Sequence, residues 1–173
     1  MPLQNGSNSV IWQSPNPPPN PRNGDMWIEK TASFGNFADF WTWDNGWLSM
    51  PLYWNVHYNG STAFQNTFLA SPLYPNGDLV IIQWVINSSM SVATDSTNQW
   101  SFNLHSLNGT NQQLPIHSGT NAGALGNTNQ RQEFGGKRIS SASEKLLRIV
   151  LTPGTTARTV VFTSSMLYQV MRP

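Results

Sequence analysis

The chain has 173 residues, a formal net charge of +1 and only 10% charged residues, while aromatic residues make up 12% and include 8 Trp. This length fits one domain of ordinary size with a short appendage. The near-neutral charge argues against nucleic acid or anionic lipid as the main partner. The chain contains no Cys, which excludes disulfides, thiolate metal sites and a cysteine nucleophile.

Turn-forming residues occur along the whole chain. Asn-Gly begins at positions 5, 23, 45, 59, 76 and 108. Asn, Gly, Ser and Thr are poor helix formers, and Asn-Gly is a strong signal for the end of a strand. The pattern therefore predicts an all-β fold with many short strands, and only residues 141–147 suggest a weak helical turn. The longest apolar run, "LVIIQWVI", has the length of a strand and is too short to span a bilayer, so we expect no membrane insertion.

The first 22 residues are predicted to form an extended, proline-rich arm. The segment "QSPNPPPNP" (13–21) can form neither a helix nor a central strand, because Pro lacks a backbone donor and biases the preceding residue to extended geometry. It separates a short head (3–12) from the rest of the chain. We interpret it as a linker or a clamp, with the head either anchored on a partner or loose.

Residues 23–52 are predicted to form a small aromatic β-meander that serves as an anchor. Its strands are expected at 25–29, 38–44 and 47–50, with Asn45-Gly46 as a two-residue hairpin turn.

The two-residue turn predicts a definite register for this hairpin. Trp43 then faces Leu48, and Trp41 faces Met50, because side chains alternate between the two faces of a sheet. These four side chains form one apolar face that needs cover, and Trp47 lies on the other face. An isolated sheet of this size is not stable, so the apolar face must be buried.

Residues 53–173 are predicted to form a jelly-roll-like β-sandwich. Trp100, Phe102 and Leu104 alternate with polar residues, as expected for a strand with one buried face. Residues 117–136 are rich in Gly, Asn and Thr, and we interpret them as a long, variable binding loop. The final segment, 166–172, either continues the preceding strand or forms a last one. Strands are expected at 79–88 (with Val80, Ile82, Trp84 and Ile86 on one side), 98–107, 145–152 and 158–165.

No motif in the sequence indicates catalysis. The chain lacks a Gly-x-Ser-x-Gly elbow, a phosphate-binding loop and a dinucleotide fingerprint. Its three histidines, His57, His105 and His117, are far apart and lack the spacing of metal ligands. The carboxylates are few and scattered. We therefore expect no enzyme, no metal site and no cofactor.

One stretch, "PRNGDMWIEK…FWTWDNGWLSM", resembles a motif of tail-fibre and other appendage proteins of tailed bacteriophages. In that motif a Pro-x-x-Gly-Asp-x-Trp segment is followed by an aromatic strand, an Asp/Asn-Gly turn and a closing Trp. This chain inserts "TASFGNFAD" between the first two strands. The resemblance implies a structural or attachment protein that is often trimeric. The matching positions are Pro21, Gly24, Asp25, Trp27, Trp41, Trp43, Asp44, Asn45, Gly46 and Trp47.

Our main hypothesis is therefore a virion structural protein, either a short fibre for attachment or a capsid decoration protein, at the surface of the particle. Its expected partners are further copies of itself in a homotrimer, other virion proteins and a host surface glycan. The residues expected at the oligomer or anchor interface are Trp27, Trp41, Trp43, Leu48 and Met50.

The alternative hypothesis is a carbohydrate-binding module or lectin-like domain, in which exposed aromatic rings stack on sugars while amides bind hydroxyls. A fibre-borne depolymerase would need a longer chain for its scaffold. The candidate glycan contacts are Trp47, Tyr53, Trp54 and Tyr58.

Overall fold

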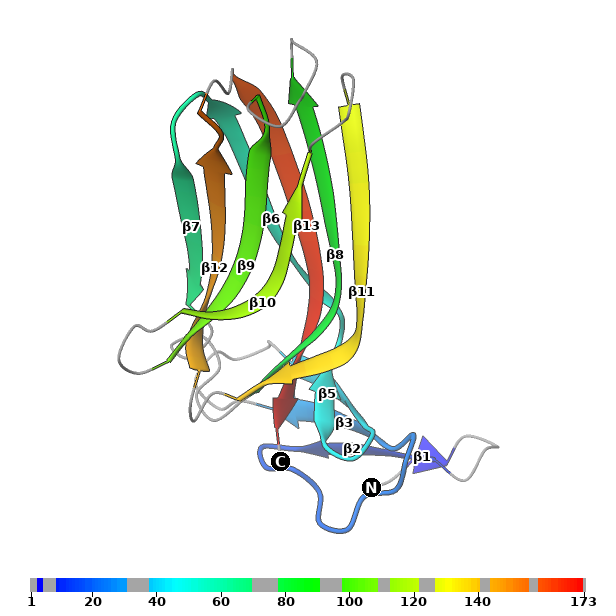
Figure 1. Ribbon diagram of the computed structural model, residues 1–173. Coiled ribbons are helices and arrows are strands. Elements are labelled where there is room, and N and C mark those ends of the chain that lie inside the picture. The colour runs from blue at the N-terminus through cyan, green and yellow to red at the C-terminus, as the bar shows by residue number, and fades with distance from the viewer. Residues whose placement is uncertain are drawn as a thin grey trace. The chain divides into compact units, whose positions relative to one another are not determined.

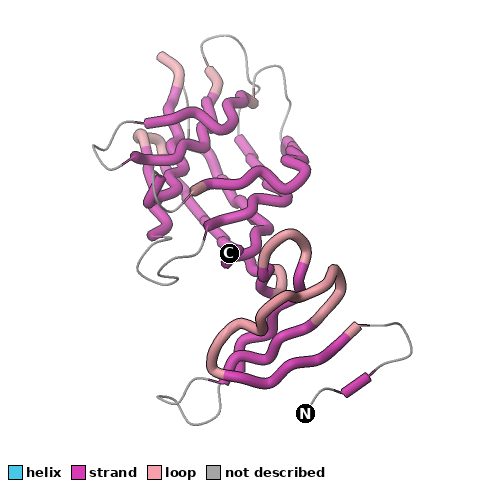
Figure 2. Tube along the Cα trace, turned by 90° about the horizontal axis from the view of Figure 1, so that it is seen from below, coloured by secondary structure: helices cyan, strands magenta, loops and turns pink. Residues whose placement is uncertain are grey.

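The computed structural model describes residues 3–4, 9–30, 38–69, 78–90, 98–108, 113–121, 127–140, 144–155 and 159–172 (Figure 1). The predicted all-β class is confirmed, since these residues form strands and loops without any helix (Figure 2). None of the described residues lies in a helix long and apolar enough to cross a membrane. The chain divides into two compact units: an N-terminal unit of Met1–Leu52 and Gln169–Pro173, and a sandwich unit of Tyr53–Tyr168.

The N-terminal unit is built on one sheet of short strands in the order β1-β2-β3-β4-β5, followed by the end of β13 (Val160–Arg172). Strands β2 and β3 are parallel, and the other neighbours are antiparallel. Two strands of the predicted arm, β1 and β2, therefore extend the expected meander at one edge, and the C-terminal end of β13 extends it at the other. The strand bounds are β1 (Leu3–Gln4), β2 (Val10–Ser14), β3 (Met26–Lys30), β4 (Ala38–Trp43) and β5 (Trp47–Ser49).

The sandwich unit has two sheets with strand orders β6-β13-β8-β11 and β10-β9-β12-β7 (Figure 1). Apart from the β9–β10 hairpin, each strand in this unit connects to a strand of the other sheet. This arrangement of eight strands is a jelly roll, which confirms the predicted fold. The strand bounds are β6 (Leu52–Gly60), β7 (Phe64–Leu69), β8 (Asp78–Met90), β9 (Trp100–Asn108), β10 (Gln113–Thr120), β11 (Asn127–Ile139) and β12 (Glu144–Pro153).

Most of the sandwich core comes from side chains that alternate between buried and outward positions along the strands. Trp100, Phe102 and Leu104 on β9 are fully buried, as the sequence predicts. The last predicted strand continues the preceding one, since β13 extends from Val160 to Arg172. Other buried side chains of this unit include Leu147, Ile149, Leu151, Phe162 and Met166.

The predicted alternation in β8 is wrong over its first half. Gln83 pairs with Glu133, whereas Ile81 pairs with Lys137, so a bulge in β11 lies opposite Ile82. At the bulge, Ile82 and Gln83 are both partly exposed, and the buried positions of β8 change from odd to even numbers. Extra residues in one strand disturb the alternation of side chains between the two faces of the sheet. The buried residues of β8 are Leu79, Ile81, Trp84 and Ile86 rather than Val80, Ile82, Trp84 and Ile86.

Two further predictions in the C-terminal half are wrong. The long loop expected at 117–136 consists largely of strand, because β10 extends to Thr120 and β11 begins at Asn127. Residues 144–147 of the expected helical turn belong to β12. Residues 122–126 and 141–143 lie outside the described part of the chain. In both segments, tertiary pairing overrides the weak local preference.

Candidate interaction site in the N-terminal unit

The predicted register of the β4–β5 hairpin is wrong by one residue. Trp43 pairs with Trp47, and Thr42 pairs with Leu48. The loop is longer by one residue than a two-residue turn, and its Asn45 has a φ of +54°. A shift of one residue moves every side chain of the second strand to the opposite face. Trp47 therefore shares a face with Trp43, and Leu48 does not.

This face carries a tryptophan cluster, formed by Trp27, Trp41, Trp43 and Trp47. Trp27 stacks on Trp41 with 5.8 Å between ring centroids. The ring of Trp47 packs edge-to-face against two others, with centroid distances of 5.6 Å to Trp27 and 5.3 Å to Trp43. Such aromatic pairs contribute about 0.5–1.5 kcal/mol each beyond their buried area. Trp47 is only 1% exposed, so its predicted role as a glycan contact is wrong: it is a core residue of this unit.

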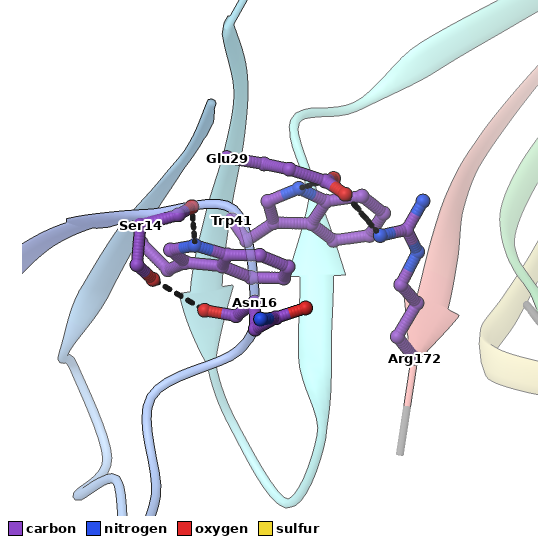
Figure 3. A network of polar contacts seen from close by, with 6 residues as sticks. Ser14, Asn16, Glu29, Trp41 and Arg172 are labelled. Atoms are coloured by element: carbon purple, nitrogen blue, oxygen red, sulfur yellow. Dashed lines mark hydrogen bonds and ion pairs between the residues drawn. The ribbon is translucent and has the colours of Figure 1, made fainter. Parts of the chain in front are cut away.

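The proline-rich segment passes on the side of the tryptophan cluster. Adjacent parallel strands such as β2 and β3 need a connection that crosses one face of the sheet. The Nε1 of Trp27 donates a hydrogen bond of 3.0 Å to the carbonyl of Ser14, where that connection begins. Figure 3 shows Ser14 and Asn16 beside the indole rings, and Pro18 is buried. Of the two interpretations of this segment, the clamp fits the structure.

Gly24 and Asp25 of the motif form hydrogen bonds to β2, to the loop before β3 and to the end of β4. The carboxylate of Asp25 accepts hydrogen bonds from the backbone N–H of Val10 at 2.8 Å and of Arg22 at 3.0 Å. Burial alone would raise the pKa of Asp25, but these backbone donors and the Arg22 charge hold it below its usual value. Gly24 has a φ of +89°, which favours glycine, and donates to the carbonyl of Trp43 at 3.0 Å.

A part-buried ion pair between Glu29 and Arg172 lies beside Trp41 (Figure 3). Glu29, which is 8% exposed, accepts a hydrogen bond from Nε1 of Trp41 at 3.1 Å and from Nη1 of Arg172 at 2.8 Å. The guanidinium of Arg172 also lies 4.5 Å from the ring centroid of Trp41, which is a cation–π contact. Arg172 is not among the residues that the sequence indicates, because no local signal links residues so far apart in the chain.

The opposite face of the same sheet is also apolar, and we call it the open face. Ile11 pairs with Met26, and Ile28 pairs with Phe40. Met26 is 38% exposed and Phe40 is 44% exposed, although both lie in the interior of a sheet. Contiguous exposed apolar patches on a folded protein typically mark an interaction surface. The apolar residues of the open face are Ile11, Met26, Ile28, Phe40, Leu48 and Met171, and Gln13, Lys30 and Thr42 lie on the same face.

The predicted interface residues therefore divide between the two faces. Trp27, Trp41 and Trp43 lie in the tryptophan cluster, whereas Leu48 lies on the open face. Met50 directly follows β5 and is 62% exposed.

The remaining glycan candidates do not form one platform. Alternation along β6 leaves Tyr53 65% exposed, while Trp54 and Tyr58 are half-buried. The ring of Tyr58 stacks on Phe64 at 4.5 Å, and its hydroxyl donates to the carbonyl of Thr62 at 2.6 Å. Tyr53 is the member of this set whose ring is accessible over most of its surface.

The described residues contain no group of three His, Cys, Asp or Glu side chains that could hold a metal ion. Burial lowers the pKa of His117, whose ring meets Trp84 edge-on at 5.8 Å. Burial and, to a smaller extent, the charge of Arg148 lower the pKa of His105. Both histidines are therefore biased toward the neutral form.

No family model and no curated protein matches this chain. Among solved structures, it is similar to VP2 in a subviral particle of infectious bursal disease virus, with 8% identity and a TM-score of 0.41. That match covers 86% of this chain and 38% of the VP2 chain, so this chain spans well under half the length of VP2.

Two further structures resemble the chain. One is the decameric BFDV capsid protein, with 11% identity and a TM-score of 0.37 over 71% of this chain and 98% of that chain. The other is the CBM22-1 xylan-binding domain of Xyn10C from Paenibacillus barcinonensis, with 8% identity and a TM-score of 0.32 over 87% and 85%. Likenesses of this size assign neither a family nor a function.

Proposed function

We propose that this protein is a non-enzymatic structural component of a virus particle, either a short attachment fibre or a capsid decoration protein of a tailed bacteriophage. It associates as a homotrimer at the particle surface and uses its N-terminal unit as the anchor. One observation carries this proposal: within the described residues of the N-terminal unit, the face of the sheet opposite the tryptophan cluster bears several apolar side chains, of which Met26 and Phe40 are exposed.

The open face favours burial against another protein. Leaving apolar surface in water costs about 25 cal/mol per Å². Each strand from β2 to the end of β13 contributes an apolar side chain to this face, and Thr42 lies between Met26 and Leu48. A second copy of the chain or a particle protein would remove this surface from water.

The motif residues support a structural role over a binding role. Asp25, Trp27 and Trp47 are all buried and are engaged in holding the N-terminal unit together. The jelly roll does not separate the two hypotheses, because both viral capsid proteins and lectins use it. The carbohydrate-binding alternative is supported by the exposed ring of Tyr53.

The experiment compares the oligomeric state of the wild-type chain with that of the double variant Met26→Asp/Phe40→Asp, by native mass spectrometry and sedimentation velocity. We expect a trimer for the wild type and a monomer for the double variant, with the circular dichroism spectrum unchanged. Val161→Asp is the matched control, since Val161 is 41% exposed on β13 in the sandwich unit. It should remain a trimer.

A wild-type monomer at all concentrations, or a double variant that still forms trimers, would contradict the proposed anchor. Immunogold labelling of purified particles then separates the two roles. Gold at the tail indicates a fibre, and gold over the shell indicates a decoration protein.

A further inference from the structure

The outer face of the β10-β9-β12-β7 sheet places a cation on an inner strand, next to rows of polar side chains. Arg148 on β12 pairs with Thr67 on β7 and with His105 on β9. His105 in turn pairs with Pro115 on β10. These four residues therefore form one row across all four strands, with Arg148 on an inner strand.

The next rows along the same strands are neutral and rich in hydrogen-bonding groups. Their neighbours toward the interior, such as Phe102 and Ile149, are fully buried, so the alternate residues face solvent. The adjacent row is Gln65, Val150, Asn103 and Ser118, and the row beyond it is Thr152, Ser101 and Thr120.

Among the described side chains, no carboxylate pairs with Arg148, in contrast to the other arginines of the described strands. Arg131, Arg138 and Arg172 each form an ion pair with an acidic side chain. Among the described side chains of this outer face, Arg148 and His105 are the titratable ones, and no carboxylate is present. Its charge is therefore not compensated within the described part of the sheet.

The immediate contacts of Arg148 leave its guanidinium available to a ligand. Its Nε lies 3.4 Å from Oγ1 of Thr67, which is a long hydrogen bond. Burial and, to a smaller extent, the Arg148 charge lower the pKa of His105, so the neutral ring adds no second positive charge beside Arg148. A planar guanidinium beside neutral donors and acceptors suits one carboxylate, which it can bind in a bidentate manner.

We propose that this outer face binds a carboxylate-bearing oligosaccharide of the host cell surface. Arg148 holds the carboxylate, while Gln65, Asn103 and Ser118 bind neighbouring sugar hydroxyls. Pro115 is exposed in the same row and contributes apolar contact to a sugar ring. A single cation among amides and hydroxyls matches a sparsely charged sugar chain better than it matches a polyanion.

This inference names the ligand of the attachment role, and it rests on the proposed function. The test measures binding of glucuronic-acid-containing hexasaccharides by titration calorimetry, with the same hexasaccharides after carboxyl reduction as the neutral probe. We expect the wild type to bind the acidic probe at least tenfold more tightly than the reduced probe. Arg148→Met should lose at least tenfold in affinity, whereas Arg148→Lys should lose less.

Arg131→Met is the matched control, because Arg131 lies in the other sheet and is paired with Glu133. It should bind like the wild type. Asn103→Ala provides a second variant if Arg148→Met does not fold, and it should weaken binding of both the acidic and the reduced probe. Equal binding of the two probes, equal affinity of Arg148→Met and wild type, or no binding at millimolar probe would each overturn the inference.

Different results would contradict the proposed virion role and the proposed sugar ligand. The monomeric Met26→Asp/Phe40→Asp variant should retain the affinity per chain, because its substitutions lie in the N-terminal unit. A trimer that binds no acidic sugar would overturn only the ligand. A wild-type monomer that does bind one would overturn the virion role and favour a carbohydrate-binding module.

Discussion

The two units of this chain bury their apolar side chains in different ways. The sandwich unit has long strands, and its core is filled by simple alternation of residues such as Phe102, Ile149 and Phe162. The N-terminal unit has strands of only two to six residues, which are too short to build such a core. It relies instead on large indole rings, a proline-rich crossover and the last residues of the chain. A small sheet therefore depends on individual contacts that a larger sandwich does not need.

The two units also differ in their electrostatics. The ion pair between Arg131 and Glu133 in the sandwich is exposed, with side chains 64% and 55% accessible, and such pairs contribute little to stability. In the N-terminal unit, Glu29 and Asp25 are buried and are satisfied by several donors each. Removing one partner there leaves a buried charge without compensation.

The largest effect is expected for Trp47→Ala. Deleting a fully buried indole from the tryptophan cluster should lower the unfolding free energy of the N-terminal unit by about 4 kcal/mol, because a cavity remains. Urea unfolding followed by tryptophan fluorescence and far-ultraviolet circular dichroism measures this change. Tyr53→Ala, an exposed residue from the same predicted glycan set, should change it by less than about 0.5 kcal/mol. Similar effects of the two substitutions would contradict the observed register.

A smaller loss is expected for Glu29→Gln. The neutral amide leaves the part-buried Arg172 without its counter-charge beside Trp41, which should cost about 2 kcal/mol. The double variant Glu29→Gln/Arg172→Met should recover part of this loss, and a double-mutant cycle in urea measures the coupling. Glu133→Gln in the exposed pair is the control and should leave the unfolding free energy unchanged. A double variant less stable than the sum of the two single variants would disprove a favourable pairing.

The smallest effect is expected for Asp25→Asn, and it changes how the unfolding free energy depends on pH. Asp25→Asn should lower stability at neutral pH by about 1–3 kcal/mol, because hydrogen bonds to a charged acceptor are lost. The pKa of Asp25 in the folded chain lies below its ordinary value of 3.8, so its contribution is fully present above that pH. The contribution is lost as the pH falls through the folded-state pKa.

Urea unfolding of wild type and Asp25→Asn across pH 2–7 checks this sign. The difference between their free energies should be constant near neutrality and should shrink below pH 3.8. A difference that grows toward acid would contradict a depressed pKa.

Alternation alone correctly predicted β9, where Trp100, Phe102 and Leu104 are buried, because the strand is regular and has one face in the core. The same argument failed in β8, where a bulge in the neighbouring strand interrupts the pattern. It failed again in the β4–β5 hairpin, where one extra loop residue moved Trp47 into the core. Local patterns identify strands, but register depends on the partner strand.

The sequence by itself determined the all-β class, the position of most strands and the importance of the Gly-Asp-x-Trp and Asn-Gly segments. These features follow from local backbone preferences and from the period of two along a strand. Only the tertiary structure decided that Arg172 meets Glu29, that the proline-rich segment passes beside the tryptophan cluster, and that Arg148 lies beside His105 on one face. Each of these pairs joins residues of distant or separate strands, and no local signal specifies which strands become neighbours.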